Sequence, residues 1–149
     1  MTAAVQTHKD LRAWQEAMSL AETVYRQAYR FPRPQADALA AQLRRTAISV
    51  PSNIAEGAGR SSARELAQFV NIASGSLAEL DTQVQLAVRL GYIASNAPLL
   101  AQLENVGKLL TGLRRSLRPK PEHESQLTNN ASPALARALA IPRAQPAIS

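Results

Sequence analysis

Apolar residues recur every three or four positions along most of the chain, the spacing that places side chains on one face of an α-helix. No stretch shows the alternation typical of a β-strand. The pattern predicts four helices, over residues 10–29, 35–57, 63–90 and 95–117. Their expected apolar faces are Leu11, Trp14, Met18, Ala21, Tyr25 and Ala28; Leu39, Leu43, Ala47, Val50 and Ile54; Leu66, Phe69, Ala73, Leu77, Leu80, Val84 and Ala87; and Leu99, Leu103, Val106, Leu110, Leu113 and Leu117.

Residues that favour helix ends flank these segments. We expect Asp10 to cap the start of the first helix, and Ser62 with Glu65 to form a capping box at the start of the third. Gly57 and Gly91 are expected to end the second and third helices, because glycine adopts the left-handed conformation without steric cost.

The connections between the predicted helices are only a few residues long, which favours antiparallel neighbours. The sequence therefore predicts an all-α fold, an antiparallel up-down-up-down four-helix bundle over residues 10–117. Residues 1–9 are expected to be a flexible N-terminus. Residues 118–149 combine prolines, alanines and scattered charge without an amphipathic period, so we expect a largely disordered tail.

Pro51 lies inside the second predicted helix, where a proline removes a backbone donor and disturbs the preceding turn. The apolar positions nevertheless stay in phase across it, which a loop would have no reason to preserve. We therefore expect a kinked second helix. Ser49, Ser52 and Asn53 are expected to hydrogen-bond to backbone groups near the kink.

The second helix is apolar over more than its core face. A lateral stripe contains an arginine and three apolar residues, and the third helix also has apolar residues beside its main face. Two interpretations stand: packing against two neighbours within the bundle, or a second apolar surface used for self-association. The candidate oligomer interface is Arg44, Ile48, Pro51, Ala55, Ile72 and Leu86, with Leu90 close by; the face opposite the core carries Arg45, Ser49, Ser52 and Glu56.

The chain has 17 lysines and arginines against 11 acidic residues, a formal charge of +6. This charge favours an anionic partner, RNA or DNA, although it is equally typical of a protein that basicity keeps soluble. The aromatic residues are too few for a base-stacking platform, so any contact would be to phosphates. The candidate nucleic-acid-binding residues are Arg45, Arg60 and Arg64; alternatively these arginines are only solvated.

Residues for catalysis are scarce. Cysteine is absent, and the two histidines, His8 and His123, lie in the flanks of the helical pattern. No nucleophile, base and orienting group come together in a recognisable motif. We therefore expect no enzyme, no catalytic residue, no cofactor and no metal site. Because neither a leader nor a membrane span is apparent, we expect a cytoplasmic protein without a membrane partner.

Three strings, DLRAWQEAM, AAQLRRTAISVPSNIAEGAGR and ELAQFVNIASGSLAELDTQVQLAVRLGYI, carry a family resemblance in this order. They resemble the small four helix bundle proteins encoded in intervening sequences of bacterial 23S ribosomal RNA genes. The resemblance covers residues 10–117. Its most specific part contains Ser52, Asn53, Glu56 and Gly57, for which a structural role is expected. Ala58 departs from the family, which commonly has a bulky aromatic residue there.

The resemblance implies a four-helix bundle that assembles as a homopentamer. The fold is similar to the accessory variability determinant of diversity-generating retroelements, a basic pentameric barrel associated with reverse transcriptase and nucleic acid. The leading hypothesis is thus a non-enzymatic homo-oligomer that binds RNA or DNA through a basic surface. The alternative is a protein–protein scaffolding module without a nucleic-acid role.

Overall fold

The computed structural model describes residues 7–119. These residues contain no strand, and they form a short 3-10 helix followed by four α-helices, so the all-α prediction is confirmed. The elements are η1 (His8–Asp10), α1 (Arg12–Tyr29), α2 (Asp37–Ala58), α3 (Ala63–Arg89) and α4 (Pro98–Ser116). Each predicted helix ends within a few residues of the observed one.

All five elements belong to the unit Met1–Leu117. The second unit, Arg118–Ser149, lies outside the described residues except for Arg118 and Pro119. The predicted disordered tail is therefore outside the description, as are residues 1–6 of the predicted flexible N-terminus.

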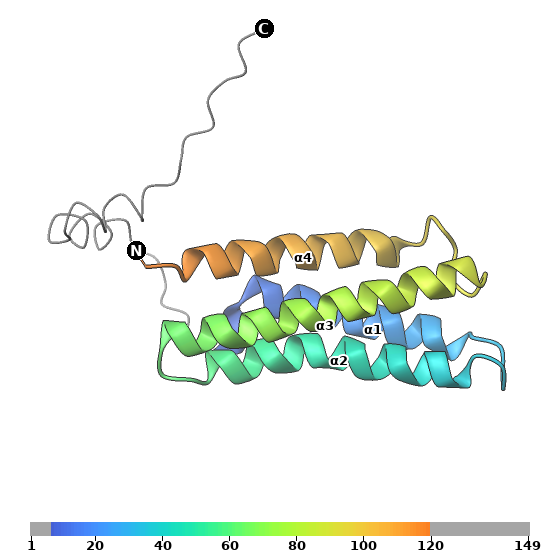
Figure 1. Cartoon of the computed structure of the whole chain (residues 1–149), viewed down its shortest axis with the longest axis horizontal. Helices are drawn as coiled ribbons and strands as arrows, with labels where there is room; N and C mark the ends of the chain where they lie inside the picture. The colour runs from blue at the N-terminus through green and yellow to red at the C-terminus, as the bar shows by residue number, and fades with distance from the viewer. Residues whose placement is uncertain (1–6, 120–149) are drawn as a thin grey trace, which may run out of the picture. The chain divides into compact units, whose positions relative to one another are not determined.

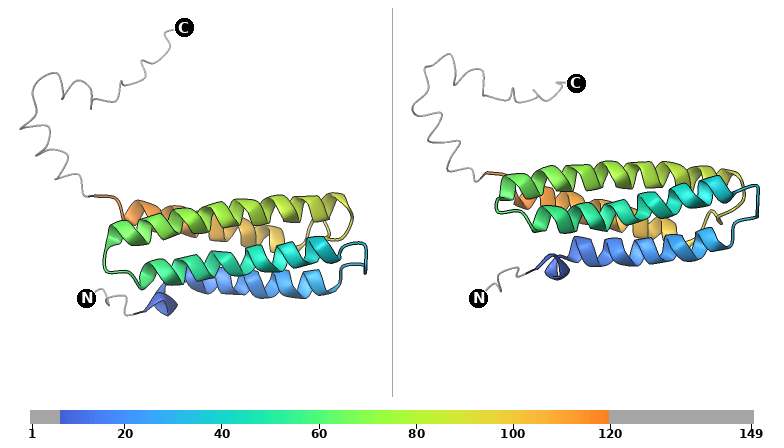
Figure 2. Two further views of the ribbon diagram at one scale, coloured as in Figure 1. Left: turned by 60° about the horizontal axis from the view of Figure 1, so that its bottom comes forward. Right: turned by 90° about the horizontal axis from the view of Figure 1, so that it is seen from below.

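The four α-helices lie side by side (Figure 1), and α2 contacts both α1 and α3, while α4 also contacts α1 and α3. The starts of α1 and α3 and the ends of α2 and α4 lie at one end of the bundle in all three views (Figures 1 and 2). The residues near these four helix termini therefore lie at the same end of the bundle.

The start of the bundle differs from the prediction at Asp10. The N-cap of α1 is Leu11, which makes no side-chain capping bond. Asp10 instead completes a capping box around η1: its carboxylate accepts from the Thr7 N–H at 3.1 Å, and the Thr7 hydroxyl accepts from the Lys9 N–H at 3.2 Å. The predicted cap of α1 is thus wrong, because the preceding 3-10 turn takes the carboxylate.

The core confirms most of the predicted faces of α2, α3 and α4. The predicted positions that are buried are Leu43, Ala47, Val50 and Ile54; Ala73, Leu77, Leu80, Val84 and Ala87; and Leu99, Leu103, Val106 and Leu110. Four more, Leu39, Leu66, Leu113 and Leu117, are partly buried against this core.

The face predicted for α1 is confirmed only in part: Ala21 and Ala28 are buried, and Leu11 and Trp14 pack against the core. Met18 and Tyr25 are 45% and 43% exposed, whereas the core receives Ala13, Ala17 and Leu20, none of which was expected there. Small side chains let helix backbones approach closely, because the distance between helix axes depends on the residues at the contact. The alanine face of α1 therefore packs inward, and the bulkier residues are left at its edge.

Pro51 lies within one continuous helix, so the prediction of a helix in place of a loop is confirmed. Gly57, however, does not end this helix: it is buried inside α2, and Gly59 is the C-cap. A Cβ on Gly57 would lie 2.6 Å from the Cβ of Phe69 in α3. The glycine is needed for close approach of two helices, which the local sequence alone did not reveal.

The end of α3 follows its prediction, and its start does so in part, because the Glu65 carboxylate accepts from the Ser62 hydroxyl at 3.1 Å in place of the Ser62 N–H expected in a capping box. The Ser62 hydroxyl accepts a hydrogen bond from the Glu65 N–H at 3.1 Å, as an N-cap should. Gly91 has φ +80° after the last turn, the left-handed conformation expected of a terminating glycine.

Candidate functional site

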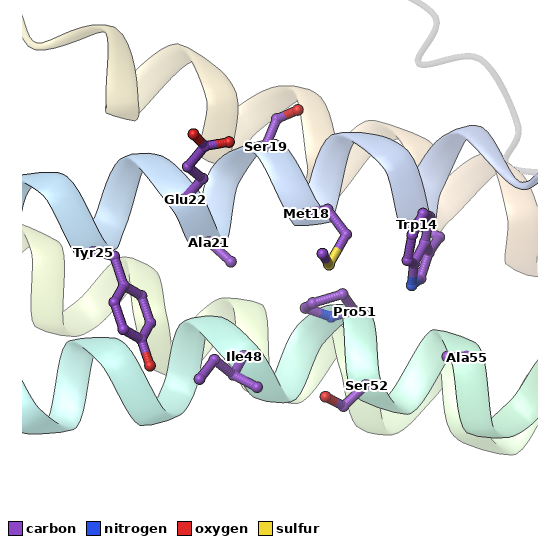
Figure 3. Close-up of a pocket in the computed structure, with 10 residues that line it drawn as sticks. All are labelled: Trp14, Met18, Ser19, Ala21, Glu22, Tyr25, Ile48, Pro51, Ser52 and Ala55. Carbon is purple, nitrogen blue, oxygen red and sulfur yellow. The ribbon is translucent and has the colours of Figure 1, made fainter. Parts of the chain in front are cut away.

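An apolar groove runs between α1 and α2, and we call it the α1–α2 groove. Figure 3 shows Met18 and Tyr25 reaching from α1 toward α2, where Ile48 and Pro51 face them. The groove has a volume of about 580 Å³ and is lined by Trp14, Met18, Ser19, Ala21, Glu22, Tyr25, Ile48, Pro51, Ser52 and Ala55. It exists because α1 turns its alanine face inward and leaves its bulky residues beside the lateral stripe of α2.

Only some residues of the predicted oligomer interface line the groove. Ile48, Pro51 and Ala55 line it, and Ile48 is 44% exposed. Arg44 is half-buried one helical turn before Ile48, beside Phe31 in a separate, smaller hollow. Ile72 and Leu86 do not line the groove. Pro51 is buried and Ala55 is half-buried, so the lateral stripe packs partly within the bundle and leaves Ile48 accessible.

Ile72 and Leu86 belong to a second surface, which we call the α3 ridge. Ile72, Glu79 and Leu86 are spaced seven residues apart, which is two helical turns, so they share one face of α3. Leu90 follows one turn later. Ile72 and Leu86 are 51% and 48% exposed, as is Leu90 at 51%. Three large apolar side chains on one helix face are thus left without a partner in the bundle.

Ser49 has different surroundings from those predicted, whereas Ser52 is exposed as expected. Ser49 was placed on the outer face, but its hydroxyl is part-buried and shares a 2.8 Å hydrogen bond with the Ser76 hydroxyl of α3. The Asn53 side-chain amide donates to the Ser49 carbonyl at 2.8 Å and to its hydroxyl at 3.1 Å. The expected local hydrogen bonding thus involves Ser49 and Asn53, and it also ties α2 to α3.

Arg60 is held by its own chain. Its guanidinium forms an ion pair with Glu56 at 3.2 Å and lies 5.1 Å from the centroid of the Phe69 ring. Arg64 is exposed in the first turn of α3. Arg45 lies fifteen residues before Arg60, roughly 22 Å away along the helix axis. The three arginines predicted to bind nucleic acid therefore do not form one site.

A different set of cations gathers where α1 and α3 start and α2 and α4 end (Figure 2). We call this region the basic end: it contains Lys9, Arg12, Arg60, Arg64, Arg114 and Arg115. Within residues 7–119, Arg12, Arg64 and Arg115 have no ion-pair partner, whereas Arg26 and Arg33 near the other end pair with Glu22 and Asp37 at 2.6 and 3.8 Å.

Four residues of the basic end, Lys9, Arg12, Arg114 and Arg115, were not predicted as binding residues. Lys9 and Arg12 lie about a hundred residues before Arg114 and Arg115 in the sequence, and the two pairs come together because the start of α1 and the end of α4 lie at the same end of the bundle. The sequence feature that could have indicated this basic cluster is the adjacent pair Arg114-Arg115 in the last turn of α4. Arg114 also donates to the Asn71 side-chain oxygen of α3 at 3.4 Å.

Two further observations concern the described part of the chain. Within it, no three histidine, cysteine, aspartate or glutamate side chains are placed to hold a metal ion. None of its helices is both long and apolar enough to cross a membrane.

No curated protein matches the chain. The family model described as 23S rRNA-intervening sequence protein matches residues 9–112, which extend from η1 through most of α4. The helical architecture agrees with this match, and its residues include the α1–α2 groove and the α3 ridge. The chain belongs to the 23S rRNA-intervening sequence protein family.

Proposed function

We propose that this chain is a non-enzymatic accessory protein that assembles with copies of itself and binds RNA or DNA through its basic end. The observation that carries the nucleic-acid part is the gathering of Arg12, Arg64 and Arg115 at one end without ion-pair partners among residues 7–119. Unpaired guanidinium groups attract phosphates by charge and can donate two hydrogen bonds to one phosphate. The formal charge of +6 adds a favourable long-range field.

Fluorescence anisotropy with a labelled ribosomal RNA fragment, and separately with duplex DNA, tests this binding. We expect affinity to fall steeply between about 50 and about 200 mM salt, because bound phosphates release their counterions. The double variant Arg64→Gln/Arg115→Gln should bind more weakly and reduce the salt slope by up to about two, roughly one for each lost phosphate contact.

The matched control is Arg30→Gln/Arg89→Gln, which also removes two positive charges, but from the opposite end of the bundle. It should retain most of the affinity. An equal loss in both double variants would show that net charge, and not the basic end, drives binding. Absence of binding at low salt by the unaltered protein would refute the nucleic-acid proposal.

The self-association part rests on the exposed apolar side chains of the α1–α2 groove and the α3 ridge. Monomeric proteins rarely leave large apolar patches exposed. We propose a homopentamer, the number implied by the family resemblance. Light scattering coupled to size-exclusion chromatography at micromolar concentration should give about five times the chain's 16.1 kDa mass. A monomer mass would contradict self-association, and another multiple would contradict only the number five.

The direction of the helices and the shape of α2 are also part of this proposal. We propose an antiparallel up-down-up-down bundle in which α2 bends at Pro51, because that proline cannot donate a hydrogen bond to the preceding turn. Residual dipolar couplings of the backbone N–H groups on either side of Pro51 would measure the bend. A single straight axis through residues 37–58 would contradict it.

A scaffolding role without nucleic acid is the second candidate, and the α1–α2 groove is the observation that favours it. An apolar groove can hold the apolar face of a partner helix. Recovery of one specific protein partner after nuclease treatment, lost on Ile48→Lys and retained on Asn105→Lys, would support this role. Nucleic-acid binding that requires Arg64 and Arg115 would argue against it.

A further inference from the structure

We infer that the α3 ridge of one copy packs into the α1–α2 groove of a second copy. This inference rests on the proposed self-association and adds which surfaces meet. The two surfaces lie on different helices of the same chain, so the contact is head-to-tail and each copy keeps one free groove and one free ridge. Such a contact repeats until a ring closes.

The two surfaces run along their helices over comparable distances, about three to four helical turns. On α2, the stripe from Arg44 to Ala55 spans eleven residues, about 16 Å at 1.5 Å per residue. On α3, Ile72 and Leu86 are fourteen residues apart, about 21 Å. A helix face that projects large side chains every two turns fits a furrow between two helices, as side-chain ridges of one helix fit the grooves of others.

The two surfaces also match in chemistry. The groove is walled by Met18, Tyr25 and Ile48, and the ridge presents Ile72, Leu86 and Leu90, all of them large and exposed. Packing one surface on the other would remove both from water, which is the main favourable contribution to association.

Charge favours the same pairing. The lateral stripe of α2 includes Arg44, and the α3 ridge includes Glu79; neither has an ion-pair partner within residues 7–119. Glu79 accepts only a 3.4 Å hydrogen bond from Gln83 of its own helix. The acidic residue of the groove, Glu22, is already paired with Arg26. Among the described residues, Arg44 on the lateral stripe beside the groove therefore offers a positive charge without an ion-pair partner, and Glu79 of the ridge offers a negative one.

A mixing experiment with the full chain tests the inference. Ile48→Lys damages the groove and leaves the ridge intact, and Leu86→Lys does the reverse. Each variant alone should be monomeric by light scattering. Mixed in equal amounts they should form a dimer and nothing larger, because the intact ridge of one variant meets the intact groove of the other while both remaining surfaces are damaged.

The control is Asn105→Lys, an exposed position of α4 outside both surfaces, which should assemble like the unaltered chain. Circular dichroism shows whether each variant keeps its helices. If the unaltered chain assembles but the mixture stays monomeric, or if either single variant still assembles fully, the inference is wrong and the proposed self-association stands. If the unaltered chain is itself a monomer, both fail.

Charge exchange gives an independent measurement. Arg44→Glu and Glu79→Arg should each weaken assembly at least several-fold in dissociation constant, and the double variant should recover most of the loss. Glu104→Arg, which breaks the exposed ion pair with Lys108 on α4, is the control and should leave assembly unchanged. Failure of the double variant to recover, with both single variants folded, would remove Arg44 and Glu79 from the interface.

Discussion

Gly57 sets how closely α2 and α3 approach. It is buried inside α2, and a Cβ added there would lie 2.6 Å from the Cβ of Phe69 and 3.1 Å from a methyl group of Leu66. Carbon atoms cannot approach to 2.6 Å without displacement of one helix. At this position glycine acts through its small size, and its conformational freedom is not used.

We expect Gly57→Ala to lower the free energy of unfolding by about 1–3 kcal/mol, the usual cost of overpacking. The control is Gly112→Ala, an exposed helical position of α4 with no atom within 4 Å of the added Cβ. That variant should be neutral or stabilise by up to about 1 kcal/mol, because alanine favours helix more than glycine does. Urea denaturation of both variants measures the difference, and equal effects would show that the contact with Phe69 relaxes freely.

At this scale, the sequence predicted what depends on near neighbours. Ser62 caps α3 and Gly91 ends it, because both roles are decided within a few residues. It failed where the partner is distant. The contact of Gly57 with Phe69 and the hydrogen bond between Ser49 and Ser76 join residues of different helices.

At the scale of one helix, α1 is the element that departs from prediction. Its buried face is dominated by alanine, and its bulkiest residues lie at the edge. A search for large apolar side chains at helical spacing therefore selects Met18 and Tyr25, which lie at the edge, and misses the buried Ala17. The faces of α2, α3 and α4 were predictable because leucine, valine and isoleucine dominate their core positions.

The assignment of the α1 face is tested by two neighbouring substitutions. Ala17→Leu should lower the free energy of unfolding by about 1–3 kcal/mol, because Ala17 is fully buried and extra methyl groups have no room. Met18→Leu should change it by less than about 1 kcal/mol, since that side chain is half exposed and the volume is conserved. Thermal denaturation with both variants at equal concentration gives the comparison; a larger effect at Met18 would restore the originally predicted face.

At the scale of the whole molecule, the basic end depends on topology. Four helices were predictable from periodicity, yet the helix termini that become neighbours depend on how the helices alternate. Arg12 and Arg115 become neighbours only in that arrangement. Of the three arginines that the sequence suggests as binding residues, Arg60 and Arg64 lie at the basic end, whereas Arg45 lies roughly 22 Å away along the helix axis.

Self-association makes a prediction about stability. If folded copies associate, association favours the folded state, so the midpoint temperature of unfolding should rise with protein concentration. We expect this rise for the unaltered chain between about 1 and about 100 µM. For Leu86→Lys we expect a midpoint independent of concentration. Calorimetry over this range measures it, and an equal rise for both would show that Leu86 takes no part in association.

The positions of the helix termini also decide where a reporter group can be attached without disturbing the proposed phosphate binding. The connection between α3 and α4, residues 90–97, lies at the end opposite the basic residues, and Asn96 there is exposed. Along α4, Asn96 and Arg115 are separated by nineteen residues, about 28 Å. Because the chain has no cysteine, Asn96→Cys would give a single thiol for a fluorophore or spin label. The connection between α3 and α4 thus supplies a labelling position remote from the proposed nucleic-acid surface.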